Sequence, residues 1–495
     1  MLKKESNYVL YYGSTGQKLI KTLSVEELIK EKRSNKEDFS LSKFIHNVFN
    51  WEYSVLPFEA DGKFVDHEFP PKKESIFEDS ANRKEQLKWV RAETLSNNGK
   101  IFEKIVPEEM KQGYFGNCWF VAAVCCLAEK QELLERIFGE NKISPIGKYK
   151  LNLFKNGQPV SVKIDSLIPV GDKSNACFGS SSNLNQMWVP LLEKAYSKLN
   201  GSYKSLTSGE CHEAFFDMTG CPSGLLEAPK IEFQWLQQKF RDGGYLMTAG
   251  INSKKPGHGY FKMMSQGLLI DHAYAIIDVR EHTETGREPV RLVKLRNPWS
   301  RFEWNGDYSD HSSKWDPKLR KDLHLCADDN DGVFWMDFGH FRSIFDTFSF
   351  CDSRHEWRSI PKSFSFNLQN ERVESPRFSF KVPGKMVLKY LSLHQNDKRI
   401  KSSPQNYIDL AGFVLKNGEG YFEDQKCVGL LESNIDRNTF SKFKLQTGEY
   451  TFVPYSSGSH FGGQNLRDVT VLLHLTPEKS DKIRLKTENG DLKTE

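Results

Sequence analysis

The stretch QGYFGNCWFVAAVCCLAEKQELLERIF, residues 112–138, carries the strongest helix signal in the chain. Asn117 is a candidate N-cap, because its short polar side chain can accept a hydrogen bond from a free amide of the first turn. Apolar residues fill the next three turns, so we expect one long helix with a buried first half and a charged second half at the surface. Cys118 would then stand at a helix N-terminus, which favours a thiolate. Taken alone, such a cysteine is more often a buried residue than a nucleophile.

Outward from this helix, the pattern changes from helical to extended. The segment 185–201, NQMWVPLLEKAYSKLNG, is predicted to be a second helix, with Pro190 near its first turn and Gly201 just after its end. The segment 201–215 is expected to be a connection between two halves. Strands are predicted beyond it, in segments rich in β-branched and aromatic residues: 245–251, 272–282, 289–299 and 331–338. After about residue 352 the chain shows strands only, which is typical of an antiparallel β-sandwich.

Length and composition limit the class of protein. The chain has 495 residues, a net charge of +4 and nine cysteines. The nearly balanced charge predicts neither a nucleic-acid binder nor a strongly acidic scaffold. The cysteines form no CxxC pair, so neither a disulfide framework nor a structural zinc site is expected. We expect a cytoplasmic protein without a transmembrane segment, because no stretch resembles a signal peptide or reaches the roughly 18 apolar residues of a membrane helix.

Two further residues stand where they could act on Cys118. His272 opens one predicted strand, and Asn297 ends the next one. If these strands pair in an antiparallel way, the Asn297 side-chain oxygen can accept from one imidazole nitrogen while the other nitrogen faces Cys118. Each residue also has an ordinary explanation, as a satisfied interior histidine and as a turn residue before Pro298. The conjunction of the three residues favours a catalytic site.

Six motifs occur in order over about residues 65–350: QGYFGNCWFVAA, MWVPLLEKAYSKLNGSYKSLTSG, FFDMTGCPSG, GLLIDHAYAIIDV, VRLVKLRNPWSRFEWNGDYSD and DGVFWMDFGHFRSIF. In these motifs the chain resembles the calpain family of papain-like cysteine proteases. The segment FKLQTGEYTFVPYSSGSHFGG is similar, less specifically, to the calpain β-sandwich domain. The resemblance implies an α+β fold: a papain-like two-lobed protease domain, with the cysteine helix in one lobe and His and Asn in a β-rich lobe, followed by an antiparallel β-sandwich.

The expected domain organisation has four parts. Residues 1–60 are an N-terminal accessory segment with short amphipathic helices, interpreted either as a covering packed on the next domain or as a partner-binding arm. The protease domain is expected at 61–350, with lobes at about 61–208 and 209–350. The β-sandwich follows at 352–476, and 477–495 is predicted to be a disordered tail.

The resemblance implies roles for five positions. Cys118 would be the nucleophile, His272 the base and then the acid, and Asn297 the residue that orients the imidazole. Gln112 would stabilise the oxyanion together with the Cys118 amide. Trp299 would shield the catalytic pair from water.

Two departures from the family pattern flank the catalytic pair. Asn117 stands where the family usually has Asp, and Asp271 stands where Gly is common. On a strand, the Asp271 side chain should point away from that of His272. We expect these changes to tune the site without inactivating it.

The resemblance also implies calcium as a regulatory cofactor, and no organic cofactor. Calcium needs hard oxygen ligands, and five acids occupy or approach the family's ligand positions. They are Glu109 and Glu193 in the first half, and Glu303, Asp310 and Asp331 in the second. Val333 replaces an expected acid, which should weaken the second site. The sequence contains no EF-hand loop.

The expected partners are protein substrates, without nucleic acid. A calpain-type β-sandwich could also contact phospholipid or another protein. Lys398, Arg399 and Lys401 are the basic candidates for meeting anionic headgroups or the protease domain. A plain scaffold packed on the protease half is the simpler interpretation.

The sequence therefore predicts an intracellular, calcium-dependent cysteine endopeptidase that makes limited cuts in proteins. The alternative is a catalytically silent calpain-like scaffold. Such scaffolds usually lack the nucleophile or the histidine, whereas this chain keeps both Cys118 and His272. A transglutaminase also uses Cys and His, but it normally orients the histidine with Asp and would lack the Asn297-Pro298-Trp299 run.

Overall fold

The computed structural model describes residues 62–487, except for 78–87, 96–99, 103–104, 106–109, 114–115, 171–178, 182–185, 254–258, 284–285, 287, 324, 326–330, 355–356, 370–371, 383–387, 400–405, 417–425, 444, 446, 463 and 476–485. The chain divides into two compact units, residues 1–68 and 69–495. The accessory segment expected at 1–60 lies outside the described residues. So does most of the expected tail, although Lys486–Thr487 forms a short strand, β22.

The single helix predicted from Asn117 to Phe138 is in fact two helices. Helix α4 spans Cys118–Ala128, and α5 spans Gln131–Phe138. The prediction was wrong because the backbone leaves the helical region at Lys130, with φ −135° and ψ 85°. Every residue of α4 is buried, whereas α5 buries only its apolar side. The expected change from a buried to a surface helix is therefore confirmed, and a turn accomplishes it.

Two more helices pack around α4 and α5. Helix α6, Trp188–Asn200, confirms the second predicted helix, with Gly201 at φ 98° just after its end. Helix α7, Cys211–Thr219, falls in the segment expected to be a connection. It is closed at its start by reciprocal hydrogen bonds of Glu210 and Glu213, a capping box in which Glu takes the place usual for Ser or Thr.

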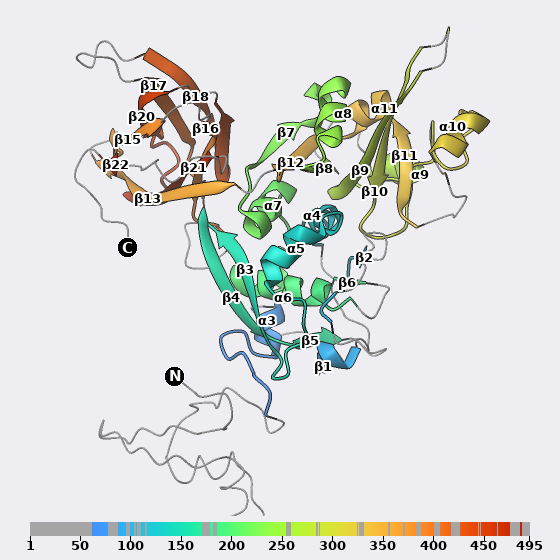
Figure 1. Cartoon of the computed structure of the whole chain (residues 1–495), viewed down its shortest axis with the longest axis horizontal. Helices are drawn as coiled ribbons and strands as arrows, with labels where there is room; N and C mark the ends of the chain where they lie inside the picture. The colour runs from blue at the N-terminus through green and yellow to red at the C-terminus, as the bar shows by residue number, and fades with distance from the viewer. Residues whose placement is uncertain are drawn as a thin grey trace, which may run out of the picture. The chain divides into compact units, whose positions relative to one another are not determined.

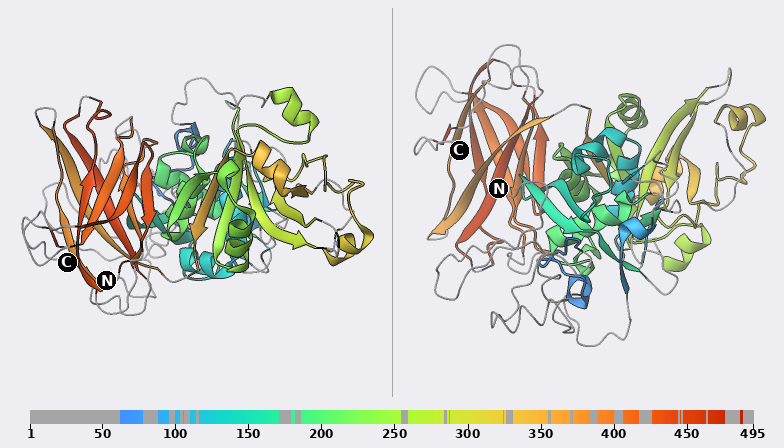
Figure 2. Two further views of the ribbon diagram at one scale, coloured as in Figure 1. Left: turned by 90° about the horizontal axis from the view of Figure 1, so that it is seen from above. Right: turned by 60° about the horizontal axis from the view of Figure 1, so that its bottom comes forward.

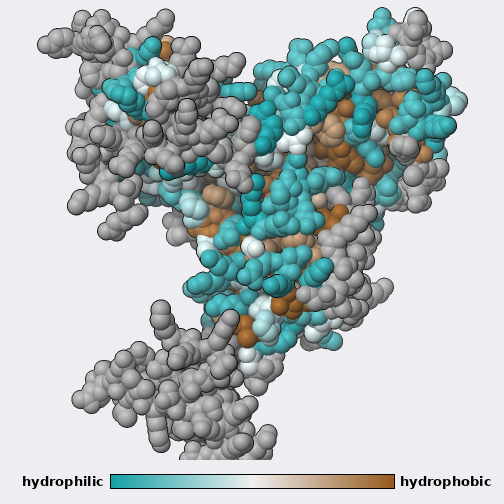
Figure 3. Space-filling model, viewed as in Figure 1, coloured by the Kyte–Doolittle hydropathy of each residue, from teal (hydrophilic) through white to brown (hydrophobic). Residues whose placement is uncertain are grey.

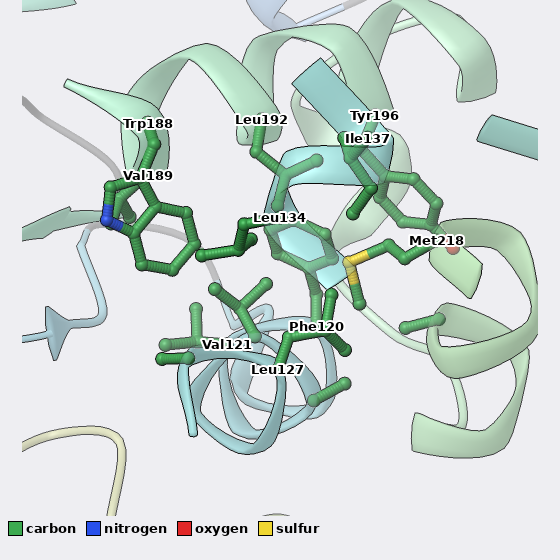
Figure 4. Close-up of a cluster of buried hydrophobic side chains, with 14 of the residues drawn as sticks. Phe120, Val121, Leu127, Leu134, Ile137, Trp188, Val189, Leu192, Tyr196 and Met218 are labelled. Carbon is green, nitrogen blue, oxygen red and sulfur yellow. The ribbon is translucent and has the colours of Figure 1, made fainter. Parts of the chain in front are cut away.

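The core of this half is built from the facing sides of these four helices. Figure 4 shows Phe120, Leu134, Leu192, Tyr196 and Met218 pointing toward one another. The rings of Phe120 and Tyr196 stack with their centroids 4.8 Å apart. The hairpin of β3 (Lys148–Lys155) and β4 (Gln158–Asp165) also packs on α6 and contributes buried apolar side chains. This packing holds α4 in place.

A six-stranded antiparallel sheet, ordered β11-β10-β9-β8-β12-β7, forms the other half (Figure 1). Its strands are β7 (Ser223–Glu227), β8 (Tyr245–Ile251), β9 (His272–His282), β10 (Val290–Arg296), β11 (Val333–Asp337) and β12 (Thr347–Asp352). The four strands predicted in this region are confirmed. Helix α4 packs against β8 and β9, so the N-terminus of α4 lies near the first residue of β9.

The C-terminal β region, residues 358–487, contains two five-stranded antiparallel sheets, ordered β14-β13-β21-β16-β19 and β18-β17-β20-β15-β22. Figure 2 draws the strands of this region in orange and red. Apolar side chains from both sheets form one core cluster. The strands are β13 (Arg358–Gln369), β14 (Arg372–Glu374), β15 (Phe378–Val382), β16 (Leu388–Gln395), β17 (Leu410–Lys416), β18 (Lys426–Asn434), β19 (Asn438–Lys442), β20 (Gly448–Tyr455) and β21 (Leu466–Leu475). The chain is thus a mixed α+β protein with a β-rich C-terminal region.

Shorter elements complete the description. They are α3 (Lys73–Phe77), β1 (Lys88–Arg91), β2 (Met110–Lys111), β5 (Leu167–Val170), β6 (Ser180–Ser181), α8 (Phe233–Arg241), α9 (Tyr260–Ser265), α10 (Pro317–Asp322) and α11 (Phe338–Ile344). On the face drawn in Figure 3, hydrophilic residues cover most of the described surface and hydrophobic patches are smaller. Within the described residues, no helix is long and apolar enough to cross a membrane.

Candidate active site

Cys118 is the first residue of α4 and lies at the junction of the two halves. Its sulfur is 3.8 Å from the carbonyl oxygen of Asp271, the residue that precedes β9. Burial raises the pKa of the Cys118 thiol, and hydrogen bonds from the backbone amides of Ala273, Trp119 and Cys118 oppose that effect only in part. The thiol is therefore protonated at neutral pH in this conformation, in spite of its place at a helix N-terminus.

Asn117 does not cap α4, contrary to the prediction. Its side chain makes no capping hydrogen bond. Its Nδ2 atom instead donates to Glu193 Oε1 at 2.7 Å, and the Gly179 amide donates to Glu193 Oε2 at the same distance. Glu193 is buried, and its burial raises the pKa of the carboxyl group to about 7. A buried carboxyl group, held by the residue before Cys118, thus lies beneath the start of the helix.

His272 and Asn297 meet as the strand pairing predicted. Strands β9 and β10 are antiparallel neighbours, and His272 Nε2 lies 2.7 Å from Asn297 Oδ1. Asn297 Nδ2 donates to the carbonyl oxygens of Arg301 at 2.7 Å and Phe302 at 3.1 Å, which orients the amide. Burial lowers the pKa of His272 to about 4, although its bond to Asn297 acts in the opposite direction. The imidazole is therefore neutral at pH 7.

Trp299 links this pair to Gln112. The indole lies against the imidazole, with ring centroids 5.2 Å apart and an interplanar angle of 68°. Its Nε1 atom donates to Gln112 Oε1 at 2.8 Å. The backbone amide of Gln112 also donates to Pro298 O at 3.0 Å, so the segment before α4 is tied to the loop after β10. These contacts join His272, Asn297, Trp299 and Gln112, and Cys118 lines the same cavity as His272, Trp299 and Gln112.

A cavity of about 300 Å³ opens over these residues. Besides Cys118 and His272, it is lined by Gln112, Gly116, Met264, Leu269, Ile270, Asp271, Trp299, Arg301 and Phe302. The apolar members from residues 264–270 and Phe302 were not predicted, because no local pattern marks a residue as facing a cavity.

Asp271 lies outside the strand on which it was expected. Its φ of 49° places it in the left-handed region just before β9, so the alternation that predicted its direction does not apply. Its Oδ1 accepts a hydrogen bond from the Ser253 amide at 3.0 Å. Glycine adopts this φ without strain, which is a physical reason for glycine to suit the position.

The five acids expected to bind calcium have different surroundings. Glu109 lies outside the described residues, and both oxygens of Glu193 already accept hydrogen bonds. Glu303 accepts from the Gly332 amide, and its pKa is raised to about 7 by burial first and then by the charges of Asp310 and Asp331. Asp331 accepts from the Val333 amide at 2.7 Å. Among the residues that the structure describes, no three acidic, His or Cys side chains converge as a metal-binding group.

The part of the chain that carries this site is similar to known proteins. Residues 64–352 match the family model of the calpain family cysteine protease domain, which is more than half of the chain. The chain belongs to the calpain family. Calpain-type cysteine protease DEK1 of Arabidopsis thaliana is 33% identical over 316 residues, which cover 59% of this chain and 14% of that protein.

Two mammalian calpains show similar relationships. Human calpain-14 is 36% identical over 299 residues, and the calpain-1 catalytic subunit of Rattus norvegicus is 33% identical over 303 residues. Both alignments cover 58% of this chain and 42% of the relative. This calpain-family chain thus spans less than half the length of these relatives. Cys118, His272 and Asn297 lie within residues 64–352, the part that matches the family model.

Proposed function

We propose that the protein is a cysteine endopeptidase that makes limited cuts in proteins inside the cell, with calcium-dependent activity. Its protease domain would have the papain-like two-lobed arrangement, and the C-terminal β region would be a calpain-type β-sandwich. The observation that carries the proposal is the hydrogen-bonded His272–Asn297 pair beside a cavity that contains Cys118 and Gln112. A scaffold without activity would have no need for this set.

The hydrogen bonds of Asn297 determine which imidazole nitrogen acts as the base. Because Asn297 Nδ2 donates to two carbonyl groups, Oδ1 faces His272 and accepts the proton on Nε2. His272 Nδ1 is then unprotonated. It would take the Cys118 proton as the sulfur attacks the substrate carbonyl carbon, and would return that proton to the leaving amine as the C–N bond breaks.

The remaining steps use the same residues. The attack places negative charge on the carbonyl oxygen, which the Gln112 side chain and the Cys118 amide would stabilise; such a donor typically contributes roughly 3 kcal/mol. His272 would next deprotonate a water molecule that attacks the thioester and releases the acid with the free thiol. Trp299, whose indole meets the imidazole at an interplanar angle of 68°, would limit the access of other water molecules.

Calcium would act on the assembly of the site. In the second half, Glu303, Asp310 and Asp331 provide the carboxylate oxygens that calcium prefers, and they are the residues that would hold it. A bound cation supplies positive charge that offsets the repulsion among these acids. In the first half, Glu193 would have to exchange the Asn117 and Gly179 donors for a metal ion. In the second half, the three acids would have to converge on the ion, since no three acidic, His or Cys side chains of the described residues form a metal-binding group.

One observation favours the scaffold alternative. The Cys118 thiol is buried, and its hydrogen bond goes to a backbone carbonyl group. A protein that never leaves this state would have an unreactive cysteine. Activity would then have to be absent at every calcium concentration.

The test is proteolysis of casein by the full chain, in millimolar calcium and in excess chelator. The proposal expects cleavage that needs calcium and is lost in Cys118→Ala but kept in Cys427→Ala, since Cys427 is an exposed thiol in β18. Cleavage that survives Cys118→Ala contradicts the mechanism. If casein is cleaved equally well in chelator and in calcium, the proposed calcium dependence is wrong, while the proposed catalytic residues are unaffected. No cleavage and no alkylation of Cys118 at any calcium concentration would establish the scaffold.

A further inference from the structure

An arginine from the C-terminal β region lies against the helix that begins at Cys118. The guanidinium carbon of Arg399 is 4.8 Å from the ring centroid of Trp119, the second residue of α4. Trp119 is buried, and its Nε1 atom donates to Leu206 O at 2.8 Å. Three basic residues were expected to meet lipid headgroups or the protease domain, and of these Arg399 contacts the protease domain. Lys398 lies over the ring of Tyr407, and Lys401 is outside the described residues.

Ion pairs, a hydrogen bond and close packing fix the position of the Arg399 guanidinium. It forms ion pairs with Glu213 of α7 and with Asp397 at 3.0 Å, and its Nε atom donates to Ser208 O at 3.2 Å. Gly209 packs directly against it. A Cβ atom at Gly209 would lie 2.3 Å from Arg399 Nη2 and 2.6 Å from the Trp119 ring. Because there is no room for a side chain there, the stack of Arg399 on Trp119 has little freedom to shift.

Arg399 belongs to a buried set of charges that we call the interface cluster: Lys155, Glu213, Asp217, Asp397, Arg399 and Arg437. Arg437 Nη1 donates to Asp217 at 2.7 Å and to Asp397 at 3.1 Å, and Lys155 Nζ donates to Asp397 at 2.6 Å. The cluster holds three positive and three negative side chains, so its formal charges balance. In a medium of low polarity, loss of one member leaves an opposite charge without its partner. The cluster thus fixes α7 and β3 to the C-terminal β region.

The charges of the interface cluster also affect the electrostatic environment of Cys118, through residues at the start of α7. Glu210, the N-cap of α7, adds to the effect of burial in raising the pKa of the Cys118 thiol. Burial, and then the charges of Glu213 and Asp436, raise the pKa of Glu210 itself to about 7, so its charge near Cys118 depends on its neighbours. Glu213 adds negative charge beside Glu210, and Arg399 offsets it. Among the described residues, the titratable groups around Cys118 include Glu210 and Cys211 from the α7 side, His272 and Tyr274 from β9, and Asp271 just before β9. Arg399 thus acts on both Trp119 and this acidic pair.

We propose that Arg399 is a positioning residue for the nucleophile, which it controls from the C-terminal β region by stacking on Trp119 and by offsetting the carboxylates of Glu213 and Glu210. The inference rests on the proposed function, since that function makes Cys118 the reacting group. It assigns the C-terminal β region a part in the reactivity of the thiol, beyond that of a packed scaffold. The planar guanidinium suits this task because it can stack and form ion pairs at once.

The experiment measures the rate of alkylation of Cys118 by iodoacetamide from pH 5 to 10, with the modified peptide identified by mass. Three variants of the full chain are compared: Arg399→Gln, Arg399→Lys and the control Lys398→Gln, which removes a neighbouring charge that does not touch Trp119. Arg399→Gln should slow alkylation at pH 7 by about tenfold, as expected for a shift of one pH unit in the titration of the thiol. Arg399→Lys should restore the pH midpoint of alkylation, because lysine keeps the positive charge. It should not restore the full alkylation rate, because lysine cannot stack on Trp119 as the planar guanidinium does. Lys398→Gln should leave both unchanged.

Cooperative thermal unfolding checks that each variant is folded. A folded Arg399→Gln protein with the rate and midpoint of the natural chain would overturn the inference. If Arg399→Gln does not fold, the test depends on Arg399→Lys. An alkylation rate in Arg399→Lys equal to that of the natural chain would then overturn the inference. Alkylation needs no proteolysis, so its dependence on Arg399 can stand even where casein is not cleaved. The alkylation experiment can thus disprove this inference without disproving the proposed function, and the casein assay can disprove the proposed function without disproving this inference.

Discussion

His272 Nε2 lies 2.7 Å from Asn297 Oδ1, on an amide whose nitrogen is held by the carbonyl groups of Arg301 and Phe302. The strand pairing brings the two side chains together, and the loop after β10 determines which end of the amide faces the ring. The neutral imidazole therefore has its proton on Nε2 and a free electron pair on Nδ1. This is the state that a general base needs before it acts.

Asn297→Asp should move the acidic limb of the pH–activity profile to higher pH. A carboxylate beside the ring favours imidazolium and should raise the pKa of His272 by about 1–3 units from its lowered value. Because only the neutral ring accepts a proton, activity at pH 5 should fall more than activity at pH 8. The measurement is kcat/KM for a peptide substrate against pH, with Asn434→Asp as a control on an exposed strand position. An unshifted limb would show that Asn297 does not govern the titration of His272.

The burial of His272 should also make stability depend on pH. The unfolded imidazole has a pKa near 6.5 and the folded one about 4, so the unfolded chain binds the proton first as pH falls. The free energy of unfolding should therefore decrease between pH 7 and pH 4, by about 3 kcal/mol more in the natural chain than in His272→Gln. Urea unfolding at several pH values measures this difference. A constant difference between the two proteins would contradict a buried, neutral His272.

Asn117→Asp should destabilise the protein at neutral pH, even though aspartate differs from asparagine by a single group. The Asn117 amide donates to buried Glu193, and an aspartate would place a second acid against it in place of a donor. We expect a loss of about 1–3 kcal/mol in the free energy of unfolding. The double variant Asn117→Asp with Glu193→Gln should recover most of it, because the new glutamine amide can donate to the introduced carboxylate. Equal losses in the single and double variants would show that the pair is not coupled.

Trp299→Phe should reduce kcat by acting through Gln112. Phenylalanine keeps an aromatic ring next to His272 but removes the hydrogen bond of 2.8 Å to Gln112 Oε1. If Gln112 stabilises the oxyanion, Gln112→Ala should lower kcat by roughly a hundredfold or more. Trp299→Phe should have a smaller effect, and the double variant should be no worse than Gln112→Ala. Steady-state kinetics of the four proteins gives the coupling, and additive effects would separate the two roles.

Local patterns predicted the strands around the site well. The predicted segments 245–251 and 272–282 coincide with β8 and β9, because turn formers bound each run of β-branched and aromatic residues. Prediction was poorer where a helix breaks or begins without a strong signal. The turn at Lys130 interrupts a run that is otherwise helical throughout, and α7 starts with a Glu capping box that the sequence segment did not suggest.

The sequence by itself determined which residue types are available for the chemistry and which strand ends carry them. Cys118, His272 and Asn297 could be named as candidate catalytic residues because motif, helix start and strand order are properties of short segments. Tertiary structure alone decided that Asn117 donates to Glu193, 76 residues away, and that Arg399 lies on Trp119. Periodicity encodes which side of an element is buried but not which distant side chain meets it there. The partners of buried polar groups depend on packing across elements, where each must find its hydrogen bond or ion pair.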